Sequence, residues 1–385
     1  MWLRDVSMVL ADRVLDCASL RIEDGYIAQI IETTGTSTHT LFPGFVDMHG
    51  DMIELELEPR IQVDFPMDVA LTHLDARLAA SGVTTAYAAV SFSRAANDGE
   101  RRSFSHTSQI IRALKAAKAD MRVDHRIHAR FDITYTEAVA ALGGLLSEGL
   151  VDLVSVMDHT PGQGQYRNLE RHIELRADHH GISLEEARQM VQAKIDAATP
   201  EEEVLSTLRT VSDLCAHHRL ALASHDDDTP QKGALMADLG AVISEFPVTL
   251  EAAQTVVARG MMTAMGAPNA MRGQSYSGNL SARAAHSAGL LHILASDYHP
   301  AAILPAIRAL ANQDADGLSG ACRLASVNPA KALGLLDRGE IAVGKRADLA
   351  LFDGRDRCAL TLRAGLPIFS NGTVEPASST ISAVA

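Results

Sequence analysis

Short apolar runs alternate with amphipathic segments through the centre of the chain. The runs predict eight β-strands, at residues 45–48, 83–92, 126–133, 153–157, 220–224, 241–246, 261–265 and 291–296. Helical patterns lie between several of them, at 107–118, 136–146, 184–198, 205–217 and 282–288. Strands that alternate with helices indicate a parallel sheet, and eight such units can close on themselves. The pattern therefore predicts an α/β fold, a TIM-like (β/α)₈ barrel with its active site at the carboxyl ends of the strands.

The two ends of the chain have a different pattern. Asp24-Gly25 lies between two alternating apolar runs, which is a strong signal for a β-hairpin. Residues 339–353 have the pattern of a strand, a turn and a second strand. We therefore expect residues 1–42 and 339–385 to form one small β domain beside a catalytic barrel at 43–338. Residues 160–204 are too long for one ordinary connection and predict an insertion or a lid.

Composition and charge narrow the class of protein. Of 385 residues, 47% are hydrophobic and 21% are charged, which is typical of a soluble globular chain and excludes a disordered one. The net charge of −14 provides no basic footprint for nucleic acid, although a local basic pocket could still hold a phosphorylated small molecule. The four cysteines are scattered, and no apolar run is long enough to span a bilayer. We expect a cytoplasmic protein without a membrane partner, and the sequence leaves formation of a homo-oligomer open.

Side chains that commonly bind metals follow the apolar runs. They are His49, Asp51, His128, Asp132, Asp158, His159, His225, Asp226, Asp227, Asp228, Glu245, Asp297 and His299. Charged side chains on buried parallel strands are costly unless they are paired or bound to a metal. Imidazole nitrogens and carboxylate oxygens together suit Zn²⁺, Mn²⁺ or a similar ion. Because such residues converge at several strand ends, the sequence predicts a metal centre.

Several of these residues also have simpler explanations. A single histidine at a strand end often serves only in loop hydrogen bonds. Asp51 shares a strand face with His49, two positions away, but it could instead begin a helix. Asp226, Asp227 and Asp228 precede Thr229-Pro230 and could cap the next helix, a role that is favoured for Asp227 and Asp228. His128 either is a ligand or lies on the face opposite the ligand of the third strand.

Three runs resemble known sequences. The run Pro-Gly-Phe-Val-Asp-Met-His at 43–49 resembles the first-strand signature of the amidohydrolase superfamily. Residues 328–335 and 344–353 resemble the helix and the strand by which these proteins return to their β domain. The likeness extends over nearly the whole chain, and it implies a metal-dependent hydrolase on a TIM-like barrel.

Further motifs are similar to those of the narrower PhnM family. They lie at 156–163, 223–227, 243–247, 265–269, 272–279 and 296–298. The members of that family are α-D-ribose 1-methylphosphonate 5-triphosphate diphosphatases of the carbon–phosphorus lyase pathway. The resemblance implies a hydrolase of phosphonate metabolism that acts on a phosphorus-containing acid anhydride and releases diphosphate from a triphosphate.

The same resemblance implies roles for individual residues. It makes His49, His159, His225 and Asp297 metal ligands, with Asp297 also the general base that takes a proton from the attacking water. Asp132 stands where the family tends to have Glu and is the candidate bridging carboxylate. Asp51 takes a ligand position that is His in the wider superfamily, and this oxygen donor shifts the preference from Zn²⁺ toward Mn²⁺ or Mg²⁺. We expect one or two divalent ions, which are Zn, Mn or Mg.

A triphosphate substrate carries several negative charges, so its pocket needs cations and amide donors. The candidate substrate-binding residues are Arg60, Gln163, Arg167, Lys232, Glu245, Asn269, Arg272, Ser277 and Asn279. The run 272–279 could also wrap backbone N–H groups around a phosphate. Two other functions stay open, namely hydrolysis of a C–N bond by a deacylase, cyclic amidase or deaminase, and a non-catalytic metal-binding scaffold. Cations close to the metal would favour the triphosphate over an acyl substrate.

Overall fold

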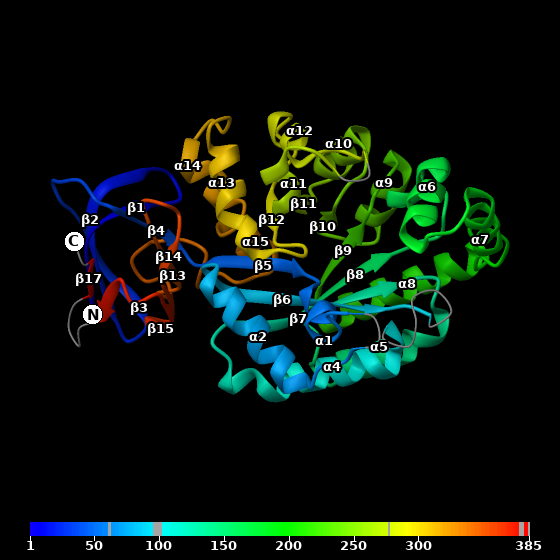
Figure 1. Cartoon of the computed structure of the whole chain (residues 1–385), viewed down its shortest axis with the longest axis horizontal. Coiled ribbons are helices and arrows are strands. Elements are labelled where there is room, and N and C mark those ends of the chain that lie inside the picture. Colours follow the sequence, from blue (N-terminus) through cyan, green and yellow to red (C-terminus); the bar gives the residue numbers. More distant parts are fainter. Residues whose placement is uncertain (61–62, 95–101, 276–277, 377–380, 384–385) are drawn as a thin grey trace.

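A parallel β-barrel forms the centre of the molecule (Figure 1). The computed structural model describes residues 1–60, 63–94, 102–275, 278–376 and 381–383. Within them, eight parallel strands pair in the order of the sequence. They are β5 (Phe45–Gly50), β6 (Val83–Phe92), β7 (Asp124–Asp132), β8 (Leu153–Met157), β9 (Ala221–His225), β10 (Ile243–Glu245), β11 (Met262–Gly266) and β12 (Ile293–Ala295). The predicted (β/α)₈ barrel is therefore confirmed.

The first and last strands of the barrel meet at their carboxyl ends. Gly50 and Asp297 form a parallel bridge. The amide of Asp51 donates to the carbonyl of Asp297 at 3.0 Å, and the amide of Asp297 donates to the carbonyl of His49 at 2.9 Å. This closure places three of the predicted metal-site residues, His49, Asp51 and Asp297, next to one another.

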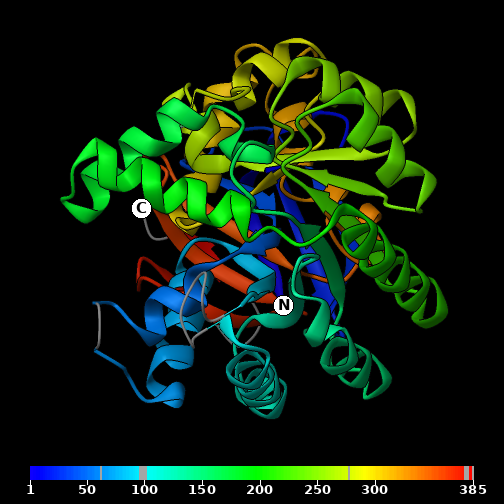
Figure 2. The same cartoon turned by 90° about the vertical axis from the view of Figure 1, so that its right-hand side faces the viewer.

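Helices surround the barrel and connect its strands (Figure 2). They are α1 (Met52–Leu57), α2 (Met67–Ala80), α4 (Phe104–Ala117), α5 (Val139–Ser147), α6 (Leu169–His180), α7 (Leu184–Asp196), α8 (Glu201–His218), α9 (Pro230–Asp238), α10 (Leu250–Ala258), α11 (Ala267–Arg272), α12 (Ala282–Ser287), α13 (Ile303–Ala311), α14 (Gly317–Arg323) and α15 (Val327–Ala332). The sequence explains their faces and ends: α13 buries Ile303, Ile307 and Leu310, one side of the helix, and a capping box of Ser183 and Glu186 begins α7. None of the described helices is long and apolar enough to cross a membrane.

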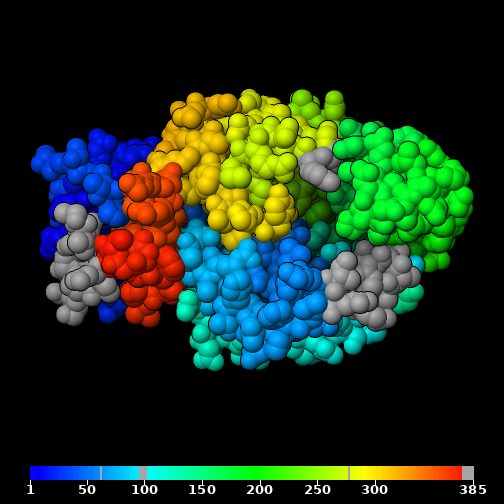
Figure 3. All heavy atoms as spheres, viewed as in Figure 1, coloured from blue at the N-terminus to red at the C-terminus, as the bar shows by residue number. Residues whose placement is uncertain are grey.

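The predicted insertion at 160–204 contains α6 and α7, which contact each other through a small apolar core of their own. The space-filling view shows this segment, in green, as one end of the molecule (Figure 3). A hydrogen bond from the amide of Gly164 to Asp228 Oδ2, at 2.8 Å, ties its beginning to the barrel. The hydroxyl of Thr199 donates to the carbonyl of Thr134 at 3.2 Å and ties its end.

A second sheet joins the two ends of the chain, at the left of Figure 1. Its described strands are β1 (Trp2–Val9), β2 (Val14–Glu23), β3 (Tyr26–Glu32), β4 (His39–Pro43), β13 (Leu349–Asp353), β14 (Cys358–Arg363), β15 (Leu366–Ser370), β16 (Val374–Pro376) and β17 (Ile381–Ala383). The β2–β3 hairpin turns at Asp24-Gly25, as expected. The strand predicted before β13 is wrong. Residues 339–348 form turns because Gly339 and Gly344 have φ values of 91° and 87°, which interrupt a strand.

An aromatic cluster joins the small sheet to the barrel, and an ion pair joins the barrel to the segment between α15 and β13. The rings of Phe45 and Phe352 stack at a centroid distance of 6.0 Å. Arg338, which precedes β13, donates to Asp124 Oδ2 at 2.8 Å and to the hydroxyl of Thr85 at 3.0 Å. Burial alone would raise the pKa of Asp124, but Arg126, Lys118 and Arg338 hold that pKa below its ordinary value. The carboxylate is thus ionised and depends on its cationic partners.

Replacing Arg338 by methionine should destabilise the fold. The variant R338M leaves the buried Asp124 without one of its cations, so we expect the free energy of unfolding to fall by about 3 kcal/mol at neutral pH. A lowered pKa stabilises the folded state above the unfolded value of about 3.9, and this contribution is lost as the pH falls. The difference between wild type and variant should therefore shrink on acidification, as measured by urea denaturation between neutral pH and pH 3.

The matched control is R112M. Arg112 pairs with Glu148 on the surface, and both side chains are about half exposed. The denaturation midpoint of this control should stay at the wild-type value. Equal midpoints for R338M and R112M would show that the Arg338–Asp124 pair does not stabilise the fold.

Candidate metal centre and active site

Two groups of potential metal ligands lie at the mouth of the barrel. The inner cluster contains His49 of β5, His128 of β7 and Glu245 of β10, all fully buried. Glu245 Oε1 lies 3.2 Å from His49 Nδ1 and 3.6 Å from His128 Nε2. Three strands that are far apart in the sequence thus direct one carboxylate and two imidazoles to the same point.

The outer cluster contains His159, His225 and Asp226, which follow or end β8 and β9. Asp226 Oδ2 lies 3.0 Å from His225 Nδ1 and 3.9 Å from His159 Nε2. The rings of His49 and His225 are 5.7 Å apart between centroids, so the two clusters are neighbours.

The donor atoms of both clusters fit a divalent cation. Both carboxylate oxygens of Glu245, Oδ2 of Asp226 and Nδ1 of His49 and His225 are buried, and none forms a hydrogen bond within the described part of the chain. Buried polar atoms without hydrogen bonds are costly and therefore need another partner. Their imidazole and carboxylate chemistry suits Zn²⁺ or Mn²⁺.

The charge states also suit metal binding. Burial lowers the pKa of His49 well below its ordinary value. Burial is also the main reason why the pKa values of His128 and His225 fall to about 3. These imidazoles are therefore neutral at physiological pH, which is the form that binds a metal.

Asp297 lies beside the clusters at the end of β12. Its φ of 57° turns the chain sharply, and Gly266 leaves room for its side chain, since a Cβ at Gly266 would lie 3.0 Å from Asp297 Oδ2. Burial, followed by the charge of Asp51, raises the pKa of Asp297 to about 7. A carboxylate in this position can accept a proton from a water in the cavity.

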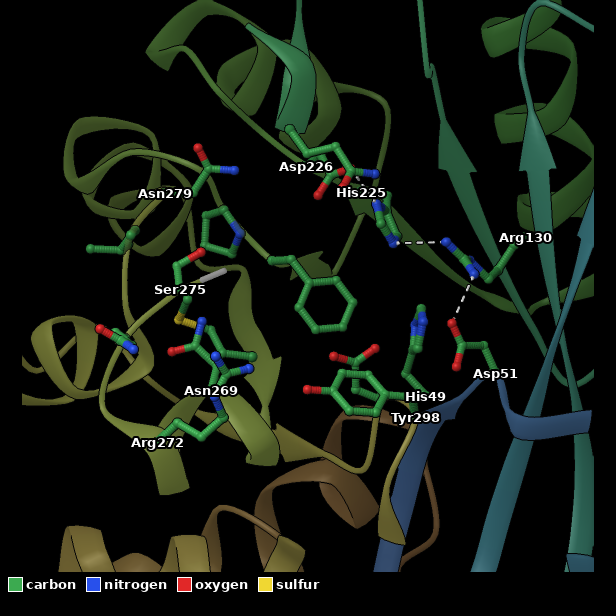
Figure 4. Close-up of a pocket in the computed structure, with 17 residues that line it drawn as sticks. His49, Asp51, Arg130, His225, Asp226, Asn269, Arg272, Ser275, Asn279 and Tyr298 are labelled. Atoms are coloured by element: carbon green, nitrogen blue, oxygen red, sulfur yellow. Dashed lines mark hydrogen bonds and ion pairs between the residues drawn. The ribbon is translucent and has the colours of Figure 1, made fainter. Parts of the chain in front are cut away.

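Arg130 of β7 lies between Asp51 and His225 (Figure 4). Its Nη1 is 3.8 Å from Asp51 Oδ2, and its Nη2 is 3.4 Å from His225 Nε2. The figure shows Asn269, Arg272, Ser275 and Asn279 on the other side of His49 and His225 from Arg130. His49 and His225 therefore lie between Arg130 and a group of amide, hydroxyl and guanidinium side chains.

Two cavities open at this mouth. The first has a volume of about 360 Å³ and is lined by His49, Asp51, Arg130, Gln165, His225, Asp226, Phe246, Pro247, Met265, Asn269, Arg272, Gln274, Ser275, Asn279, Leu280, Asp297 and Tyr298. The second, of about 530 Å³, is lined by Asp51, Arg94, Arg102, Arg130, Asp132, Thr134, His159, Thr160, Pro161, Gln165, Tyr166, Arg176, Ala193, Lys194, Ala197, Ala198 and Thr199. They share Asp51, Arg130 and Gln165. Of the described residues that line the second cavity, five are Arg or Lys and two are Asp.

The structure brings most of the predicted metal ligands together. His49, His159 and His225 belong to the two clusters, and Asp51 and Asp297 line the first cavity beside them. Asp51 does begin α1, but its side chain does not cap that helix. Asp132 belongs to neither cluster. Its Oδ1 accepts hydrogen bonds from the amide and hydroxyl of Thr134, at 2.9 and 2.6 Å, and the residue lines the second cavity.

The predicted substrate-binding residues are distributed more widely. Asn269, Arg272 and Asn279 line the first cavity, whereas Glu245 lies in the inner cluster. Lys232 Nζ donates to the carbonyls of His225 and Asp226, at 2.9 and 3.0 Å, and so braces the outer cluster. Arg60, Gln163 and Arg167 line neither of these two cavities. Ser277 lies outside the described residues.

Sequence reasoning missed several residues of the site. Asp226 was named only among the possible metal-binding side chains, and His128 was left undecided. No role was given to the cations that line the second cavity, which are Arg94, Arg102, Arg130, Arg176 and Lys194. The signal for β7 was present, because His128, Arg130 and Asp132 alternate with apolar residues and therefore share one face of the strand.

The capping role suggested for Asp226, Asp227 and Asp228 is wrong. Thr229 caps α9 by accepting from the amide of Lys232 at 3.2 Å. Asp227 instead accepts the hydroxyls of Ser224 and Ser244 inside the barrel.

Comparisons with known proteins extend these observations. A model of the Amidohydrolase family matches residues 40–379. The chain is 34% identical over 367 residues to alpha-D-ribose 1-methylphosphonate 5-triphosphate diphosphatase of Escherichia coli (strain K12), and the match covers 92% of this chain and 96% of that protein.

Similar solved structures include N-acetylglucosamine-6-phosphate deacetylase from Thermotoga maritima, with a TM-score of 0.63 at 15% identity over 96% of this chain and 100% of that one. Another is 5-methylcytosine deaminase from Klebsiella pneumoniae, with a TM-score of 0.65 at 16% identity over 96% of this chain and 98% of that one. At these identities the likeness shows the fold. Together with the family match over most of its length, these findings show that the chain belongs to the amidohydrolase family.

Proposed function

We propose that this protein is a divalent-metal-dependent hydrolase that releases diphosphate from α-D-ribose 1-methylphosphonate 5-triphosphate. The relative of that activity is 34% identical over nearly the full length of both chains. The observation that carries the proposal is the second cavity, where Arg94, Arg102, Arg130, Arg176 and Lys194 lie next to the candidate metal ligands. A triphosphate needs such a concentration of cations, whereas an amide or a nucleobase does not.

The residues of the site have distinct tasks in this proposal. His49, His128 and Glu245 would hold one ion, and His159, His225 and Asp226 a second. A bound divalent ion polarises a phosphoryl oxygen and lowers the pKa of water. Asp297 accepts the proton of the attacking water and orients that water toward phosphorus. Arg130, on the wall between the two cavities, stabilises negative charge that develops on the phosphoryl oxygens.

The direct test measures phosphate and diphosphate release with Mn²⁺, Zn²⁺ and Mg²⁺ supplied separately. The substrates are ribose 1-methylphosphonate 5-triphosphate and ATP as a second triphosphate. We expect metal-dependent release of diphosphate that a chelator abolishes. If neither phosphate nor diphosphate is released while metal is bound, the proposal is wrong and C–N bond hydrolysis becomes the favoured function. Amides and nucleobases would then be tested as substrates. Sub-stoichiometric metal without any hydrolysis would instead support a metal-binding scaffold.

Replacing Asp297 by asparagine should lower the turnover number. The amide keeps the shape of the side chain but cannot take a proton, so we expect kcat to fall about 10²- to 10⁴-fold. The measurement is the rate of diphosphate release at saturating substrate, together with the metal content of the variant. The matched control is D75N. Asp75 is a buried carboxylate that pairs with His125 near the beginning of β7, and its loss should leave kcat unchanged. Wild-type turnover in D297N would remove Asp297 from the mechanism.

Replacing Glu245 by glutamine should weaken metal binding. The substitution removes the negative charge between His49 and His128, so metal affinity should fall by more than the loss of about 10- to 100-fold that is typical of groups outside the ligand shell. Metal content after dialysis, measured by mass spectrometry, gives the result. The variant D132N is the comparison, because Asp132 lies in neither cluster and its loss should remove less metal. A greater loss in D132N than in E245Q would assign the ligand role to Asp132 instead.

A further inference from the structure

The insertion at 160–204 supplies part of the wall of the second cavity. Arg176 comes from α6, and Ala193 and Lys194 come from α7. The insertion also contributes seven further lining residues, namely Thr160, Pro161, Gln165, Tyr166, Ala197, Ala198 and Thr199. The remaining lining residues, among them Asp132 and Arg130, belong to the barrel strands and the segments that follow them. In Figure 2 the insertion is the part of the molecule nearest the viewer, in green across the barrel. The shape and charge of this cavity therefore depend on a segment that is no part of the barrel itself.

The arginines of α6 and α7 differ in whether they form ion pairs. Arg171 of α6 pairs with Glu174, and Arg188 of α7 pairs with Glu170, and both arginines are about half exposed. Arg176 is half-buried beside the cavity and forms no ion pair with a carboxylate of the described residues. Its Nε donates instead to Nε2 of His172 at 3.2 Å. Arg171 and Arg188 are thus paired with carboxylates. The guanidinium of Arg176 is instead placed where an anionic ligand in the cavity could bind it.

Neighbouring side chains hold Arg176 in place. Burial, and then the charges of Arg176 and Lys194, lower the pKa of His172 to about 4, so the imidazole is neutral and accepts the Arg176 hydrogen bond. The ring of His172 lies 4.3 Å from the ring of Tyr166 between centroids. The ring centroid of Tyr166 in turn lies 6.0 Å from that of His159 in the outer cluster. A short row of rings therefore sets the position of Arg176 relative to the candidate metal site.

We propose that the second cavity is a polyphosphate subsite that binds the diphosphate part of the substrate through Arg176 and Lys194 of the insertion. Arginine and lysine recognise phosphate oxygens by charge-assisted hydrogen bonds, and a preorganised guanidinium such as that of Arg176 loses little entropy on binding. The first cavity, with Asn269, Asn279 and Arg272, takes the sugar and its second anionic group. This assignment rests on the proposed function, because it places the two ends of that substrate in the two cavities.

The test uses the metal-loaded, full-length protein and inorganic diphosphate as the probe. Calorimetric titration at a fixed metal concentration gives the dissociation constant, and the metal content is measured before and after. We expect R176Q to weaken diphosphate binding about 10- to 100-fold, which is the loss of one hydrogen bond to a charged group. The variant R171Q, on the same helix, should change it by less than about twofold. Ribose 5-phosphate should bind to R176Q as it does to wild type, and this also reports on folding.

The outcomes separate the two proposals. If wild type releases diphosphate from the triphosphate but R176Q and K194Q bind diphosphate as tightly as wild type does, the subsite is wrong and the function stands. If wild type binds diphosphate, R176Q does not, and no triphosphate is cleaved, the subsite stands and the function fails. Should R176Q lose ribose 5-phosphate binding as well, K194Q becomes the deciding variant. Wild-type diphosphate affinity in K194Q then overturns the subsite.

Discussion

The carboxylate of Glu245, fully buried between two imidazoles, is the constraint on which the site depends. A charge in such a place is unfavourable unless a cation or a proton compensates it. His49 and His128 are neutral because burial lowers their pKa values, so they cannot supply that cation themselves. A divalent cation held at this point, which three strands of the barrel define, would compensate the carboxylate.

The residues that follow three of the barrel strands also have an unfavourable backbone conformation. Asp226, Phe246 and Asp297 follow β9, β10 and β12, and their φ values are 56°, 53° and 57°. This left-handed conformation is unfavourable for residues other than glycine and persists only where the surrounding structure holds it. Closure of the barrel provides that restraint at Asp297, which exchanges backbone hydrogen bonds with the segment at His49. The geometry of the candidate base and the closure of the fold are therefore one and the same set of contacts.

Patterns along the chain predict the features that depend on residues close together in the sequence. The alternation of apolar runs identified the barrel strands, Asp24-Gly25 identified a hairpin, and the strand ends identified where polar groups gather. What they could not predict is which side chains meet. Glu245 meets His49 and His128 only because β10, β5 and β7 converge in the closed barrel. Long side chains add a further uncertainty. Lys232, for example, donates to two backbone carbonyls and lines neither of the two cavities.

The division between barrel and insertion explains how one fold can serve different substrates. The barrel contributes the candidate metal ligands and Asp297, and a similar barrel is found in the deacetylase and the deaminase of similar structure. Chemistry on carbon or on phosphorus can use the same ion, because both need a polarised oxygen and an activated water. What differs is the charge that the substrate brings. In the proposed subsite, Arg176 and Lys194 of the insertion would act on the part of a substrate that extends from the barrel mouth. Selectivity for a polyphosphate can therefore be added without altering the residues that perform the reaction.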